Sequence, residues 1–241
     1  MKKLQLLFIG LMAFCSCTKN ANVPVIYSND TTKVKVTGTD TITYLALGDS
    51  YTYGEAEPQN ESFPYQLVNT LTVSSTFYVP APTVIATTGW TTEELIDAIA
   101  SSNIHTKKYS IVTLLIGVND QFRGVPQSTY QVRFQQVLNT AIDFANGDVT
   151  RVFVLSIPDY GVTPFASGQD GVIGPEIDQF NAINKAISVK AGVHYVDITA
   201  ISRQAATDPS LIAPDGLHPS AKMYSDWIQK LYPPVLARLN K

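Results

Sequence analysis

From residue 41 onward, short apolar runs alternate with longer segments in which apolar residues recur every three or four positions. The short runs have the length and composition of strands, whereas the periodic segments are typical of helices with one buried face. We expect strands at residues 42–47, 83–86, 110–116, 151–156 and 193–198. We expect helices at residues 64–73, 92–100, 128–145, 175–190 and 220–231, and a short helical piece between the strand at 193–198 and the loop at 208–219. A further short piece at 235–239 is separated from the last helix by Pro233 and Pro234.

The alternation of strands and helices indicates a parallel sheet with helices on both faces. The segment IVTLLI at residues 111–116 is apolar almost throughout, as a central parallel strand should be. The chain has 241 residues, which is enough for one domain with a proper core. We therefore predict an α/β fold, a three-layer α/β/α sandwich with a central, mostly parallel five-stranded sheet over residues 41–241.

The first 17 residues have the pattern of a targeting segment. Lys2 and Lys3 precede an apolar run at residues 4–14, which is roughly half of what a membrane-spanning helix needs. The string AFCSC before TKN resembles a bacterial lipoprotein signal in which residues 1–16 are removed and Cys17 carries lipid. An ordinary secretory signal cut nearby is the alternative. We expect export from the bacterial cytoplasm, as a periplasmic or outer-membrane lipoprotein that contacts the membrane by its lipid anchor only.

Residues 17–40 are rich in Thr, Asn and Val and show no helical period, so we expect a flexible tether with a short edge strand near residues 33–36. The composition and charge of the chain are consistent with the predicted fold. Apolar residues make up 45% of the chain, charged residues make up 15%, and the net charge is −3, which suits a globular protein. Basic residues do not cluster beyond Lys2-Lys3, which argues against nucleic-acid binding. We expect a monomer.

Polar signatures follow three of the expected strands. The first strand ends at Gly48-Asp49-Ser50, the second at Thr87-Thr88-Gly89 and the third at Gly117-Val118-Asn119-Asp120, and a late loop carries Asp215-Gly-Leu-His218. Open parallel sheets bind ligands at the carboxyl ends of their strands. A serine there can act as a nucleophile if a base lies at hydrogen-bond distance. The sequence lacks HExxH, Cys/His clusters and glycine-rich phosphate loops, so we expect neither a metal nor a cofactor.

These blocks, in this order, resemble the SGNH branch of the GDSL esterase/lipase family, whose fold is flavodoxin-like. The strings LGDSYTYGE, IPDYGVTPF and DGLHPS look like those of bacterial secreted members. The resemblance implies that Ser50 is the nucleophile, His218 its general base and Asp215 the residue that orients the imidazole. It implies that the oxyanion donors are the backbone N–H groups of Ser50 and Gly89 and the side-chain amide of Asn119.

The resemblance implies a serine esterase that acts through an acyl-enzyme on Ser50. Short-chain acyl or acetyl esters of carbohydrates or lipids are the expected substrates, since the chain has no long exposed apolar segment. Tyr160 and Trp90 are candidates for substrate binding, although Trp90 would equally suit a packing role. Asp49 and Asp120 are expected to bind loop backbone. The alternative function is a non-catalytic surface lipoprotein that keeps the hydrolase fold and binds glycan or protein.

Overall fold

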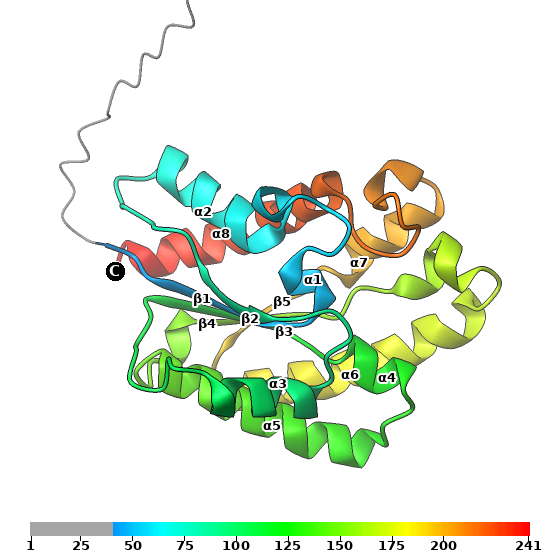
Figure 1. The fold of residues 1–241 in the computed structure, drawn as a ribbon, viewed down its shortest axis with the longest axis horizontal. Helices are drawn as coiled ribbons and strands as arrows, with labels where there is room; N and C mark the ends of the chain where they lie inside the picture. The colour runs from blue at the N-terminus through cyan, green and yellow to red at the C-terminus, as the bar shows by residue number, and fades with distance from the viewer. Residues whose placement is uncertain (1–40) are drawn as a thin grey trace, which may run out of the picture. The chain divides into compact units, whose positions relative to one another are not determined.

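The computed structural model describes residues 41–241, which form an α/β fold with a parallel five-stranded sheet at its centre (Figure 1). The strand order is β2-β1-β3-β4-β5, and all four neighbouring pairs are parallel. The five predicted strands are confirmed. Their bounds are β1 (Tyr44–Gly48), β2 (Thr83–Ala86), β3 (Ile111–Leu115), β4 (Val152–Leu155) and β5 (His194–Val196).

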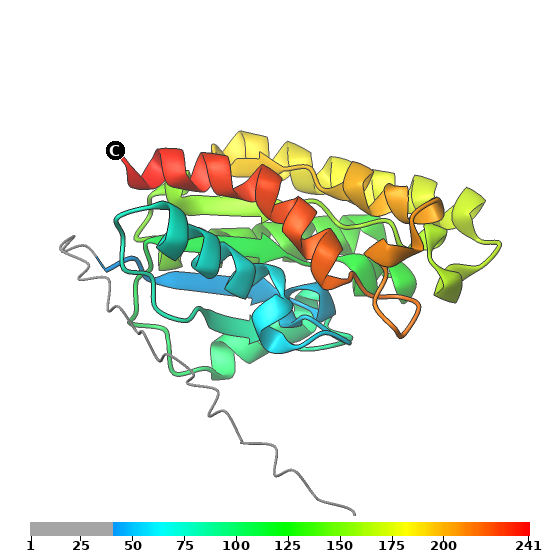
Figure 2. The same ribbon diagram turned by 90° about the horizontal axis from the view of Figure 1, so that it is seen from above.

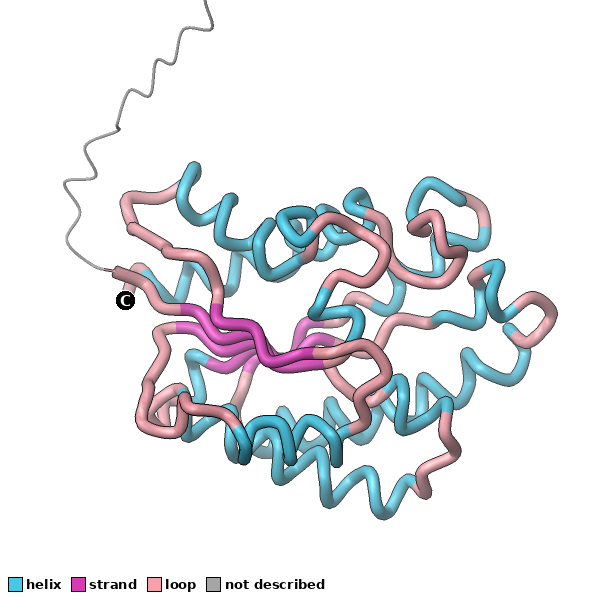
Figure 3. The backbone as a smooth tube through the Cα atoms, in the orientation of Figure 1, coloured by secondary structure: helices cyan, strands magenta, loops and turns pink. Residues whose placement is uncertain are grey.

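Helices cover both faces of the sheet, as predicted. On one face, α2 (Phe63–Ser74) packs against α8 (Ala221–Leu239); on the other lie α3 (Thr92–Ser101), α5 (Gln127–Phe144) and α6 (Asp170–Ala191) (Figures 1 and 2). In Figure 3 the strands form a thin middle layer between these two helical layers. The short helical piece expected after the last strand is α7 (Thr199–Ser202), but the periodicity missed two other short helices, α1 (Ser50–Tyr53) and α4 (Val118–Phe122). They span four or five residues, which is too short for a period of 3.6 to show.

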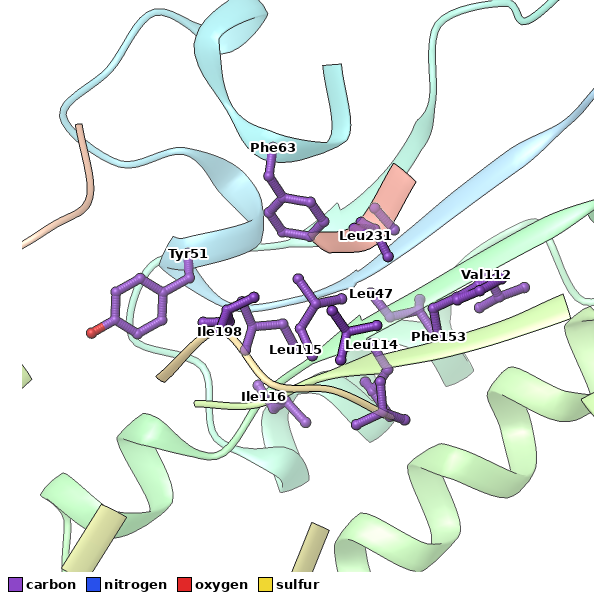
Figure 4. Packing of buried hydrophobic residues seen from close by; sticks show 14 of the residues in the cluster. Leu47, Tyr51, Phe63, Val112, Leu114, Leu115, Ile116, Phe153, Ile198 and Leu231 are labelled. Carbon is purple, nitrogen blue, oxygen red and sulfur yellow. The ribbon is translucent and has the colours of Figure 1, made fainter. Parts of the chain in front are cut away.

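The core lies on both sides of β1, β3 and β4, whose residues are all buried. Leu47 and Leu114 sit among the side chains that the neighbouring elements contribute, including Phe63 of α2 and Leu231 of α8 (Figure 4). Within residues 41–241, no helix is both long and apolar enough to cross a membrane. The expected signal, lipidation site, tether and edge strand lie outside the described residues.

Two prolines behave differently from the prediction. Pro233 and Pro234 do not interrupt the last helix, because α8 runs through them to Leu239. Each removes one hydrogen bond to the carbonyl four residues earlier, and those carbonyls belong to the exposed residues Gln229 and Lys230, where water can replace the missing donors. The buried side chains of Leu231 and Val235 hold the helix on the core on either side.

The segment at 157–174, for which the sequence pattern predicts neither a strand nor a helix, is partly helical. It contains two 3-10 turns, Tyr160–Val162 and Pro164–Ala166, and α6 already begins at Asp170 rather than at residue 175. Pro175 is tolerated inside α6 because the carbonyl that it deprives of a partner belongs to Gly171, in the exposed first turn.

The ends of three strands coincide at Gly48. This residue pairs with Ala86 of β2 and with Leu115 of β3, so the polar signatures that follow these strands lie on the same edge of the sheet. A Cβ atom at Gly48 would lie 2.1 Å from Oγ1 of Thr52 and 2.4 Å from the carbonyl oxygen of Leu115. Glycine is therefore required where α1 turns back over the end of β1.

Two acids are buried just beyond this edge, and both bind loop backbone, as expected. Oδ1 of Asp49 accepts the N–H of Tyr51 at 3.0 Å, while Oδ2 is buried with no partner in the described chain. The carboxylate of Asp120 accepts both the N–H and the hydroxyl of Thr92, at 2.8 and 2.7 Å. Burial raises the pKa of Asp120, and it raises the pKa of Asp49 from 3.8 to about 8.

Gly48→Ala should lower the free energy of unfolding by about 1–3 kcal/mol or more, because the added methyl group overlaps Thr52 and Leu115. Gly171→Ala is the matched control, since its Cβ would meet no atom within 4 Å, and we expect its stability to stay the same or rise slightly. Urea unfolding of both variants measures the difference. Equal midpoints would contradict the steric requirement at Gly48.

The raised pKa of Asp49 predicts a pH dependence of stability. The folded protein keeps a proton on this carboxyl that the unfolded chain releases, so its contribution to stability is full at low pH and is lost as the pH rises toward about 8. Asp49→Asn cannot ionise and keeps an acceptor for Tyr51. The wild type should therefore lose stability relative to Asp49→Asn between about pH 5 and about pH 8. A constant difference in unfolding midpoint across this range would show that Asp49 does not titrate there.

Candidate active site

Ser50 and His218, predicted from separate parts of the sequence, line one cavity of about 100 Å³. Ser50 is the first residue of α1, and Asp49 caps this helix, so the strand, the cap and the helix fix its position together. His218 lies in the loop that leads into α8, and both residues are largely buried. The end of β1 and the loop before α8 thus bring the predicted nucleophile and the predicted base to one cavity.

The loop at residues 213–218 folds back on itself to bring Asp215 to His218. The N–H of Ala213 donates to the carbonyl of His218 at 2.8 Å, and Gly216, with a φ of +76°, makes the turn between them. Oδ2 of Asp215 lies 2.5 Å from Nδ1 of His218. Oδ1 accepts the backbone N–H groups of Leu217 and His218, both at 3.0 Å.

These hydrogen bonds set the charge of Asp215. Partial burial tends to raise the pKa of this carboxyl, but the bonds from the His218 side chain and from the two backbone N–H groups outweigh it, so the pKa lies below its ordinary value. An ionised carboxylate can only accept hydrogen bonds. Nδ1 of His218 therefore carries a hydrogen, so in the neutral imidazole Nε2 is the atom with the lone pair that a general base requires.

Tyr51 supports the imidazole from the side of the core. Its buried ring meets that of His218 edge-on, with centroids 5.9 Å apart, and it meets Trp227 of α8 at 6.4 Å. The residue directly after Ser50 thus packs against His218.

The three donors expected for an oxyanion hole differ in where they lie and in what they bind. The N–H groups of Ser50 and Gly89 donate no hydrogen bond to any residue from 41 to 241. The amide of Asn119, which lines the cavity, donates one hydrogen to the carbonyl of Trp90 at 2.9 Å and has a second to offer. Gly89 does not line the cavity, but it adjoins the residue that Asn119 binds.

The two aromatic candidates for substrate binding, Tyr160 and Trp90, lie in different surroundings. Tyr160 lines the cavity and donates its hydroxyl hydrogen to Oε1 of Gln121 at 2.9 Å. Trp90 packs against the core and is not part of the cavity wall.

Sequence reasoning missed Phe122 and Phe165, which line the cavity although they are 59% and 55% exposed. Their ring centroids lie 6.3 and 6.5 Å from that of Tyr160, and 6.4 Å from each other. Phe122 follows Asn119 by three residues, but α4 is too short for this spacing to be read as one helical face. Phe165 stands in the string IPDYGVTPF, where nothing local distinguishes it from a packing residue.

The remaining histidines lie elsewhere. His194 stacks on Phe153 with centroids 4.7 Å apart, and His105 bonds to the carbonyl of Ala100. In the part of the chain that the structure describes, no three His, Cys, Asp or Glu side chains are placed to hold a metal ion.

Comparison with known proteins agrees with this geometry. A sequence model of the GDSL-like lipase/acylhydrolase family matches residues 46–225, a span that includes Ser50, Asn119, Asp215 and His218. No curated protein matches the chain.

Several solved structures share the fold at low sequence identity. The lipase Lip_vut3 from a goat rumen metagenome is 20% identical, with a TM-score of 0.66 over 80% of this chain and 97% of that one. The esterase EstA from Pseudoalteromonas sp. is 17% identical, with a TM-score of 0.61 over 83% and 100%. The acetylxylan esterase Axe2 from Geobacillus stearothermophilus is 18% identical, with a TM-score of 0.60 over 83% and 94%. The family match over most of the sequence, together with this fold, shows that the chain belongs to the GDSL-like lipase/acylhydrolase family.

Proposed function

We propose that this protein is a serine esterase that hydrolyses carboxylic esters through an acyl-enzyme on Ser50. Ester hydrolysis follows at family level from the match to acylhydrolases. The observation that carries the mechanism is the cavity shared by Ser50 and His218, where the Asp215–His218 hydrogen bond leaves Nε2 free to accept a proton. Every catalytic group in this mechanism is a side chain or a backbone group of this chain, and water is the second reactant.

In the first half of the reaction, Oγ of Ser50 attacks the ester carbonyl carbon while Nε2 of His218 takes the hydroxyl proton. The carbonyl oxygen becomes an oxyanion, and the N–H groups of Ser50 and Gly89 and the amide of Asn119 donate to it. The C–O bond to the alcohol then breaks, and His218 gives its proton to the leaving alkoxide. A base of this kind contributes roughly 10²–10⁴-fold, and one oxyanion donor on the order of 10²–10³-fold.

In the second half, water attacks the acyl-enzyme. Nε2 of His218 takes a proton from the water, the same donors hold the second oxyanion, and the bond between the acyl carbon and Oγ breaks as His218 returns the proton to Ser50. The carboxylic acid leaves. Asp215 stays ionised throughout and stabilises the imidazolium that forms in both halves.

The size of the cavity supports a short acyl group. A volume of about 100 Å³ is well below the ~300–1,000 Å³ of sites for drug-sized ligands. Since about 10–15 Å³ of such volume is enough to hold one water molecule, the cavity has room for a short acyl group of several non-hydrogen atoms. Acetyl and other short acyl esters of carbohydrates or lipids fit this limit.

The proposed location is the periplasm or the outer membrane, with Cys17 as the lipid-bearing residue. This proposal rests on the sequence of residues 1–17 alone.

Ser50→Ala should reduce the hydrolysis of p-nitrophenyl acetate by at least about 10⁴-fold while the fold persists, because the nucleophile is lost. Ser167→Ala is the control, since Ser167 is exposed and lies outside the cavity, and it should keep full activity. A fluorophosphonate probe should label the wild type at Ser50. Turnover that survives in Ser50→Ala would contradict the mechanism, and a wild type that neither turns over esters nor reacts with the probe would favour the non-catalytic binder.

Phe122→Ala and Phe165→Ala should shift the preference toward longer acyl chains, because both rings close the cavity around Ser50. We expect the ratio of kcat/KM for p-nitrophenyl hexanoate to that for the acetate to rise about tenfold, which is within the range for one or two methylene groups in an apolar pocket. Val132→Ala, an exposed apolar residue of α5, should leave the ratio unchanged. An unaltered chain-length profile in both phenylalanine variants would show that these rings do not limit the acyl group.

A further inference from the structure

The segment from Gly89 to Thr92 is bound along its length by the residues that follow β3. Nη2 of Arg123 donates to the carbonyl of Gly89 at 2.6 Å. The amide of Asn119 donates to the carbonyl of Trp90 at 2.9 Å, and Asp120 accepts both donors of Thr92. The loop after β2 therefore takes its position from α4 and its C-cap, Arg123.

Arg123 is itself held by a second partner. Its Nη1 lies 3.1 Å from both carboxylate oxygens of Glu94. Glu94 is fixed in turn, because Oε2 accepts the N–H of Thr91 at 2.7 Å in the capping box that begins α3. The guanidinium group thus bridges the carbonyl of Gly89 and the first turn of α3.

The bridge that Arg123 forms is exposed to solvent. Its loss should therefore affect the orientation of the Gly89 backbone more than the stability of the fold. The side chains of Arg123 and Glu94 are 47% and 42% exposed, and ion pairs this open contribute little to stability. Gly89, by contrast, has a φ of +87° and the wide conformational freedom of glycine, so its peptide groups need an outside partner to keep one orientation.

We propose that Arg123 is a positioning residue of the oxyanion hole. By binding the carbonyl of Gly89, it fixes the glycine backbone so that the N–H of Gly89, which bonds to no residue from 41 to 241, is kept for the oxyanion. Arg123 acts through Gly89 and touches neither Ser50 nor His218. This role rests on the proposed esterase function. It adds to that function the residue that holds Gly89, the donor that lies outside the cavity wall.

The test compares Arg123→Met with Arg133→Met. Arg133 pairs with Glu93 at 2.7 Å, so it bridges to the same first turn of α3 without touching Gly89. On p-nitrophenyl acetate, Arg123→Met should lower kcat by about tenfold or more and change KM by less than about twofold, since an oxyanion donor acts mainly in the transition state. Arg133→Met should change neither constant. Arg123→Lys, whose ammonium group can still donate to the carbonyl, should recover part of kcat.

The other possible results of this test would contradict the positioning role of Arg123. If the wild type is active and Arg123→Met keeps its kcat, raises only KM, or loses no more than Arg133→Met, the positioning role is overturned and the esterase function stands. An equal loss of kcat in Arg123→Lys and Arg123→Met would also overturn it, because a donor to the carbonyl would then make no difference. If the wild type hydrolyses no ester and Ser50 resists the fluorophosphonate, the proposed function fails, and the role of Arg123 fails with it.

Discussion

The close approach at Gly48 is the constraint on which the rest of the site depends. β1 ends between β2 and β3 at a point where the side chain of Thr52 and the carbonyl of Leu115 leave no room for a Cβ atom. The chain can therefore turn into α1 immediately, with Ser50 at its first position. Because Gly48, Ala86 and Leu115 are in register, the loops that carry Gly89 and Asn119 leave the sheet at the same level.

Most of the fold could be predicted from the sequence because its signals are local. The apolar runs of β1 and β3 are buried on both faces, and a run of that kind is visible without any knowledge of its neighbours. Local signals fail at the prolines of α8. Pro233 and Pro234 predict a break, but the helix continues because Leu231 and Val235 are buried and pack on the core. Tertiary contacts decide such cases, and a single sequence does not contain them.

The residues of the candidate site also fall into those that the sequence predicts and those that it does not. Ser50, Asp215 and His218 stand in short strings whose residue types suit one reaction, so their grouping could be predicted and the structure places Ser50 and His218 on one cavity. Phe122 and Arg123 could not be found, because each matters through a partner that is distant in sequence. Phe122 meets Phe165 across the cavity, and Arg123 meets the carbonyl of Gly89. Neither residue type nor local spacing indicates a contact of this kind.

Two backbone donors and one carboxyl oxygen at this edge of the sheet have no partner in the described chain. The N–H groups of Ser50 and Gly89 bond to no residue in the described range, and Oδ2 of Asp49 is buried without a donor. An unpaired buried polar group destabilises a protein by about 1–3 kcal/mol, so a fold selected for stability alone would remove such groups. Local violations of this sort are expected where a site is built for a charge that exists only during a reaction. A protein that merely bound glycan would have no use for an unpaired backbone donor on a buried serine that shares a cavity with a histidine, and this supports an esterase over a binder.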